Sequence, residues 1–140
     1  MAPLMEAVRA GGEGLGPEDA AAGRRAEIED VLREVAHPDV ECLMFGPNRS
    51  FPLEAHGIEG FIEAWGDWLS PFDRWRMELE DVIESGDRVV TLVRQYAHPR
   101  GSRAEVANAG GAVWFMRDGR LSRVEFHLDR QAALRAGGVG

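Results

Sequence analysis

The spacing of hydrophobic residues changes along the second half of the chain, from a helical repeat to a strand repeat. Between Gly57 and Phe72, in GIEGFIEAWGDWLSPF, apolar side chains recur every three or four residues, which predicts an amphipathic helix. From Met77 the period falls to two, in MELEDVI, RVVTLVRQYA, GGAVWFMR and LSRVEFHLD, which predicts four strands. Asp118 and Gly119, between the last two, are typical of a two-residue hairpin turn. The pattern predicts a sheet wrapped around an aromatic helix, with an apolar hollow that suits a small, mostly apolar molecule.

Local signals predict the remaining elements. A helix is expected from Pro17 to His37-Pro38, because proline favours the first helical turn and disfavours a helical residue before it. A short strand is expected over Val40–Phe45, and Asp129 is placed to cap a closing helix in DRQAALRA. The four long strands are expected at Arg76–Glu84, Arg88–His98, Arg103–Arg117 and Arg120–Leu128. Gly110-Gly111 predicts a bulge or a sharp bend within the third of them.

Composition and charge narrow the class of protein. Residues 1–16 are rich in Gly and Ala and are expected to be flexible, and residues 17–140 are assigned to one domain. The chain has 24 acidic and 16 basic residues, a formal net charge of −8, which argues against nucleic acids and anionic membranes as partners. Cys42 is the single cysteine, so no disulfide framework is expected. No signal peptide, membrane span, phosphate-binding loop or metal-ligand motif is visible, so we expect a soluble, cytoplasmic protein without cofactor or metal.

Five strings in their order resemble the SnoaL-like branch of the nuclear transport factor 2-like superfamily, which also holds ketosteroid isomerases, limonene epoxide hydrolases and scytalone dehydratases. They are HPDVE (37–41), HGIEGFIEAW (56–65), GDRVVTLVRQ (86–95), VWFMRDGRL (113–121) and DRQAALRAGG (129–138). The resemblance implies an α+β fold, in which a strongly curved mixed sheet forms a cone closed by helices. It also implies a dimer through the sheet. The Gly-rich start departs from the family, in which the first helix usually runs straight into the second.

The hairpin turn sets an expected register for the last two strands. Without a bulge, Phe115 pairs with Ser122, Val113 with Val124, and Gly111 with Phe126. One face then carries Val113, Phe115, Val124, Phe126 and Leu128, and the other carries Trp114, Met116, Arg123, Glu125 and His127. The first face is more apolar and is expected to line the interior. The second, with Leu121, is expected to form a homodimer interface, since exposed Trp and Met are a liability in a monomer. A one-residue slip would instead turn Glu125 and His127 towards the cavity.

The resemblance also implies where catalytic residues would stand. In the polyketide cyclases and epoxide hydrolases of the superfamily, a catalytic Asp lies on the last strand at the position of Phe126, so the usual acid is missing here. In limonene epoxide hydrolases, the strand that corresponds to RVVTLVRQY carries an Arg and, two residues on, an Asp. Arg94 matches the first, Tyr96 replaces the second, and alternation places both on one face with Leu92. Glu41 aligns near a cavity-lining position and is the expected partner of Arg94, because an unpaired buried charge is costly.

Each of these residues has a functional and a structural interpretation. Arg94 would polarise a ligand carbonyl with Tyr96 donating a hydrogen bond, or it would only form an ion pair that closes the cone. His56 is a candidate acid or base at the cavity rim, or an ordinary loop histidine. Trp65 and Trp68 would clamp a flat ligand, or they simply fill the core. The catalytic candidates are thus Arg94, Glu41, Tyr96 and His56, and the ligand-binding candidates are Trp65, Trp68, Leu92, Val113, Phe115 and Phe126.

Three functions remain open on the sequence. The first is a small-molecule pocket that catalyses isomerisation, cyclisation or hydrolysis of a small apolar carbonyl or epoxide without a cofactor. The second is a ligand-binding protein without chemistry, which the missing acid at Phe126 favours. The third is a protein-interaction module that dimerises through its sheet. Fold alone does not choose among these functions, so the choice depends on which residues line the cavity.

Overall fold

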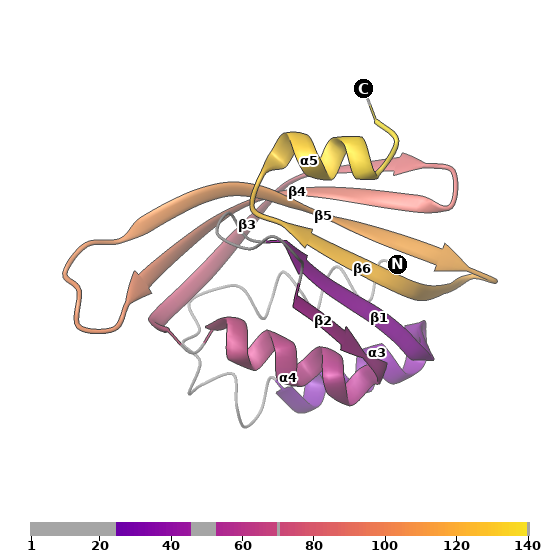
Figure 1. Cartoon of the computed structure of the whole chain (residues 1–140), viewed down its shortest axis with the longest axis horizontal. Coiled ribbons are helices and arrows are strands. Elements are labelled where there is room, and N and C mark those ends of the chain that lie inside the picture. The colour runs from indigo at the N-terminus through magenta and orange to yellow at the C-terminus, as the bar shows by residue number, and fades with distance from the viewer. Residues whose placement is uncertain (1–24, 46–52, 70, 140) are drawn as a thin grey trace.

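The computed structural model describes residues 25–45, 53–69 and 71–139, which form one six-stranded mixed sheet with helices on both faces (Figure 1). The helices are α3 (Arg25–Val35), α4 (Gly57–Leu69) and α5 (Arg130–Ala136). The strands are β1 (Ala36–Phe45), β2 (Leu53–His56), β3 (Phe72–Ser85), β4 (Arg88–Pro99), β5 (Val106–Arg117) and β6 (Arg120–His127). Their spatial order is β2-β1-β6-β5-β4-β3, with β1 and β6 parallel and the other neighbours antiparallel. The flexible segment and helix start expected before residue 25 lie outside the described residues.

Most elements expected from the hydrophobic pattern are present. The aromatic helix is confirmed as α4 and ends at Leu69, shortly before Pro71. The closing helix α5 begins after Asp129, whose carboxylate accepts a hydrogen bond from the Gln131 amide at 3.0 Å. Strand β2 was not predicted, because a four-residue strand is too short to show a period. The helix expected to end at His37-Pro38 ends instead at Val35, and β1 begins at once.

The helices divide the sheet into two faces, which we call inner and outer. The inner face is covered by α3 and α4, whereas α5 lies on the outer face (Figure 1). Helix α4 buries Ile58, Phe61 and Ile62, spaced three and four residues apart, against the inner face. Burial of this stripe fixes the direction in which α4 crosses the sheet.

The β5–β6 hairpin has the expected turn but a different register. Asp118 and Gly119 both have positive φ, 55° and 78°, as a two-residue turn that follows the twist of the strands requires. Beyond the turn, Met116 pairs with Leu121 but Phe115 pairs with Arg123, so that Ser122 is an extra residue in a bulge. The Ser122 hydroxyl donates to the Phe115 carbonyl at 3.0 Å. The bulge shifts the pairing by one residue, and the expected pairs of Phe115, Val113 and Gly111 are therefore wrong.

This shift changes which residues of β5 lie in the core. Trp114 pairs with Val124 on the inner face, is 2% exposed, and donates its indole N–H to Thr91 Oγ1 at 3.0 Å. Met116 packs against the same core, and Leu121 is fully buried in it. The prediction that Trp114, Met116 and Leu121 form an exposed outer surface is wrong, because one bulged residue turns them inward.

The other set of β5 residues lies under α5. Val113 and Phe115, together with Leu92 of β4, pack with α5 on the outer face. The prediction that these three residues line the interior is therefore wrong. Gly111 allows this approach, because a Cβ there would lie 2.8 Å from Ala133 Cβ of α5. Of the bulge or sharp bend predicted at Gly110-Gly111, the bulge is wrong, since the β4–β5 register runs unshifted from Val106 to Phe115. The glycine pair serves close packing.

Candidate functional site

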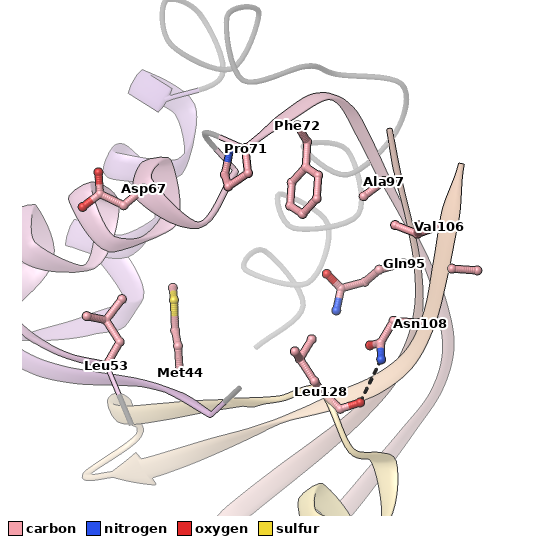
Figure 2. Close-up of a pocket in the computed structure, with 11 residues that line it drawn as sticks. Met44, Leu53, Asp67, Pro71, Phe72, Gln95, Ala97, Val106, Asn108 and Leu128 are labelled. Carbon is pink, nitrogen blue, oxygen red and sulfur yellow. Dashed lines mark hydrogen bonds between the residues drawn. The ribbon is translucent and has the colours of Figure 1, made fainter. Parts of the chain in front are cut away.

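A cavity of about 560 Å³ opens at one end of the inner face. It is bounded by the end of α4, the start of β3, the second half of β4, the start of β5, and the ends of β1 and β6 (Figure 2). Its lining residues are Met44, Leu53, Asp67, Pro71, Phe72, Gln95, Ala97, Val106, Ala107, Asn108 and Leu128. Most of this lining is apolar, and three residues supply polar groups.

The cavity follows from a mismatch between helix and strand lengths. Helix α4 has 13 residues, so it spans about 20 Å at 1.5 Å per residue. Strand β4 has 12 residues and spans about 40 Å at 3.3 Å per residue. Helix α4 can therefore cover only about half the length of the strands. The cavity lies where β4 and β5 continue beyond it, and the hydrogen bond from the Arg100 amide to the Pro71 carbonyl (3.0 Å) joins the start of β3 to the end of β4.

The polar groups of the cavity are two carboxamides and one carboxylate. Gln95 of β4 and Asn108 of β5 are register partners, so their side chains project side by side from one wall. Figure 2 shows the pair with Met44 and Leu53 across the cavity. The Asn108 side-chain N–H donates to the Leu128 carbonyl at 3.0 Å. Asp67 on α4 is exposed and contributes the carboxylate.

The predicted ion pair between Arg94 and Glu41 is wrong. Arg94 lies on the outer face, where its Nε is 3.6 Å from Glu80 Oε2, and Arg130 of α5 donates to the same carboxylate. Two residues further along β4, the ring of Tyr96 stacks against the Arg76 guanidinium, whose Cζ lies 3.8 Å from the ring centroid. Alternation on β4 turns Gln95 and Ala97 towards the cavity. Arg94 and Tyr96, the residues before and between them, therefore point away from it.

Glu41 and His56 also lie on the outer face. They are register partners on β1 and β2, and so share a face of the sheet. Glu41 Oε2 is 3.5 Å from Arg123 Nη1 on β6. The four catalytic candidates thus fall into two groups on the outer face, Arg94 with Tyr96 and Glu41 with His56. None of them lines the cavity.

Charged side chains of β1 and β6 form a continuous chain of contacts on the outer face, which we call the outer polar row. Its members are Glu41, Arg123, Glu125 and His127. Arg123 Nη2 lies 2.6 Å from Glu125 Oε2, and His127 Nε2 lies 3.0 Å from Glu125 Oε1. The His127 ring stacks on Phe45, with centroids 4.5 Å apart. The His127 hydrogen bond and the Arg123 charge together hold the pKa of Glu125 below its ordinary value, in spite of burial. As predicted, Glu125 and His127 point away from the cavity, although both are buried and do not face solvent.

Comparison with known proteins places the chain in a family. A model of the SnoaL-like domain matches residues 18–124. The chain belongs to the SnoaL-like family. No curated protein matches it. The α+β fold with a curved mixed sheet, predicted from the resemblance, is confirmed.

Solved structures of SnoaL-like and related proteins share this fold at low identity. TerC, co-crystallised with polyporic acid, is 24% identical, with 93% of this chain and 94% of that chain covered and a TM-score of 0.64. A candidate SnoaL-like polyketide cyclase of a Jannaschia species is 21% identical, with 99% and 94% covered and a TM-score of 0.64. A protein with a ketosteroid isomerase-like fold from Catenulispora acidiphila, in complex with trimethylamine, is 13% identical, with 98% and 93% covered and a TM-score of 0.65.

In this SnoaL-like domain, the aromatic ligand-binding candidates belong to the core. Phe126 faces inward as predicted, where it contacts Phe61, Trp65 and Trp114 at centroid distances of 6.1, 5.4 and 5.8 Å. Neither Phe126 nor Trp65 lines the cavity. The side chain of Trp68 lies outside the described residues. The interpretation of the aromatic residues of α4 as core fits Trp65, which packs against the core cluster and Phe126.

Pattern reasoning on the SnoaL-like sequence missed Asp67, Gln95 and Asn108. A signal for Gln95 was present, because the strand RVVTLVRQYA offers two alternating sets of residues. The set that contains Gln95 carries no charge, whereas the set chosen as interior contains Arg94. The cost of burying an arginine favours the uncharged set. Asn108 had no such signal, since it needs the β4–β5 register to place it beside Gln95.

Two classes of site find no support in the described part of the chain. It contains no group of three or more His, Cys, Asp and Glu side chains placed to hold a metal ion. Its helices are too short or too polar to cross a membrane.

Proposed function

We propose that this SnoaL-like domain binds a small, uncharged and mostly apolar molecule in the cavity beside α4. The observation that carries the proposal is an apolar hollow with two adjacent carboxamides on one wall. Its volume of about 560 Å³ falls within the range of small-molecule sites. Apolar walls supply affinity by removing ligand surface from water, and the few polar groups set the orientation of the ligand.

The charge of the lining argues for an uncharged ligand. The described lining residues include one carboxylate, Asp67, and no cationic side chain. The cations Arg94 and Arg123, which would have favoured an anion, point to the outer face. An anionic ligand would therefore lose its hydration and meet no opposite charge in exchange.

A second candidate function is catalysis without a cofactor, and Asp67 is the observation that favours it. Among the described lining residues, Asp67 alone carries an ionisable side chain, which a general acid or base needs. A carboxylate beside an apolar pocket can take a proton from a carbon next to a carbonyl group, as an isomerisation or a cyclisation requires. The Gln95 carboxamide would then donate to the oxygen on which negative charge develops.

Binding is tested by filling the cavity from its rim. Val106 is a cavity-lining residue that is 48% exposed, so Val106→Trp should block the cavity without disturbing the core. Val82 is a matched control, since it is a strand valine, 46% exposed, that does not line the cavity. Thermal shift and calorimetry with uncharged aryl ketones, enones and epoxides should show binding to wild type and Val82→Trp and at least about tenfold weaker binding to Val106→Trp. Equal binding to all three proteins would place the ligand elsewhere.

The same panel separates binding from catalysis. If Asp67 transfers a proton, Asp67→Asn should abolish turnover of a substrate from the panel while its affinity changes by less than about threefold. Turnover that survives in Asp67→Asn would rule out Asp67 as the acid or base. Binding without turnover in wild type would support the ligand-binding function alone.

A further inference from the structure

The carboxamide of Asn108 has a fixed orientation. Its Nδ2 lies 3.0 Å from the backbone carbonyl oxygen of Leu128. Because a carbonyl only accepts hydrogen bonds, the NH₂ end of the carboxamide must face it, and the oxygen end must face away. The Leu128 carbonyl thus sets the orientation of the carboxamide, with Oδ1 at the end that faces away from it.

Oδ1 is a buried acceptor. Asn108 Oδ1 is buried and accepts no hydrogen bond from the part of the chain that the structure describes. Gly110 makes room for the oxygen, since a Cβ there would lie 3.0 Å from it. Buried side-chain oxygens are nearly always hydrogen-bonded, because a lost bond to water has to be replaced. An unpaired acceptor on a residue that lines a cavity is therefore best explained as one that a ligand completes.

We propose that Asn108 Oδ1 determines the specificity of this cavity, and that the ligand is an apolar molecule with a hydroxyl group, such as a phenol. The inference rests on the proposed function, since it names the class of ligand that the cavity takes. A hydroxyl donates to Oδ1, whereas a ketone or an ether of the same shape offers only another acceptor. Oδ1 is closed to water before binding, so this hydrogen bond is not offset by the loss of a protein–water bond.

The hydroxyl reaches Oδ1 through a change of rotamer in the side chains around it. Gln95 and Leu128 border Asn108 in the same cavity, and both are only partly buried. A rotamer change in such side chains needs no movement of the strands, so it opens Oδ1 to the ligand without disturbing the sheet. A site that discriminates by hydrogen bonding rejects the analogue without the donor, because the buried acceptor is then left unpaired in the complex.

A pair of ligands that differ only in the donor tests this inference. The affinities of 2-naphthol and 2-methoxynaphthalene are measured by calorimetry for wild type, Asn108→Leu and Gln95→Leu. Wild type should bind the naphthol about tenfold more tightly than its ether. Asn108→Leu, which has nearly the same shape, should reduce this ratio to about one by weakening the naphthol alone. Gln95→Leu should keep a clear preference, because it removes a neighbouring carboxamide and leaves Oδ1 in place.

The outcomes distinguish the two proposals. Wild type could bind naphthol and ether with equal affinity, and Val106→Trp could bind both more weakly. This result would overturn the assignment of Oδ1 and leave the proposed function standing. Binding of neither compound to wild type would overturn both. If Asn108→Leu does not fold, Asn108→Val takes its place, and the wild-type ratio still decides whether a donor is preferred.

Discussion

At the scale of single residues, Glu125 shows how a charge is held inside the sheet. It is the only buried acidic residue among those whose burial the structure describes, with 7% of its surface exposed. Arg123 donates to one carboxylate oxygen at 2.9 Å, and the His127 ring nitrogen lies 3.0 Å from the other. These contacts replace the hydration that Glu125 loses, and for that reason its pKa is lowered although burial alone would raise it.

The lowered pKa of Glu125 predicts how the stability depends on pH. A carboxyl group whose pKa is lower in the folded state stabilises the fold above its unfolded pKa, about 4.3, and this contribution is lost as the pH falls through the folded pKa. Glu125→Gln should lower the free energy of unfolding by about 1–3 kcal/mol at pH 7. In urea unfolding, the difference from wild type should shrink as the pH falls below about 5.

The exposed Glu84 provides a control for this measurement. Glu84→Gln should change the free energy of unfolding by less than about 0.5 kcal/mol both at pH 7 and at acidic pH, as exposed surface substitutions do. If the difference in free energy of unfolding between wild type and Glu125→Gln grew as the pH fell, the predicted pH dependence would be wrong.

At the scale of elements, the packing of α5 on the outer face depends on glycine. A Cβ on Gly111 would lie 2.8 Å from Ala133 Cβ and 3.1 Å from the Thr91 carbonyl oxygen. The side chain of Ala133 is fully buried in this contact. Small residues on both sides therefore set the distance between α5 and β5, and the same contact covers Val113.

Gly111→Ala should destabilise the protein, because the added methyl group forces α5 away from the sheet. We expect a loss of about 1–3 kcal/mol, the usual cost of overpacking. Gly66→Ala on α4 is the matched control, since a Cβ there meets no atom within 4 Å. It should stabilise the protein by about 0.5–1 kcal/mol through helix propensity. Thermal unfolding of both variants checks the pair, and an unchanged midpoint for Gly111→Ala would mean that α5 adjusts freely.

At the scale of the whole molecule, the long strands create the cavity and the short helices leave it open. The homodimer through the outer face stays a prediction. Its expected apolar contacts, Trp114 and Leu121, are buried in the inner core. Val82 and Val106 are the large apolar side chains that stay exposed in the described part of the chain. Sedimentation at micromolar concentration should show a dimer if the prediction is right, and a monomer would contradict it.

The sequence by itself determined the elements and the family. Periods of 3.6 and 2 located α4 and the four long strands, Asp118-Gly119 marked the hairpin, and the ordered strings identified the SnoaL-like domain. These features depend on neighbouring residues along the chain, and local patterns therefore carry them.

The tertiary structure decided which side of each strand faces the cavity. Alternation divides a strand into two sets of residues but does not say which set lies inward. On β4 the answer depends on Glu80, whose carboxylate on the outer face pairs with Arg94 and also with Arg130 of α5. On β5 it depends on one bulged residue, Ser122, which moves Trp114 into the core. The acceptor of Asn108 exists only because Leu128, 20 residues away, binds the other end of its carboxamide. Such contacts join residues that are distant along the chain, and only the folded structure brings them together.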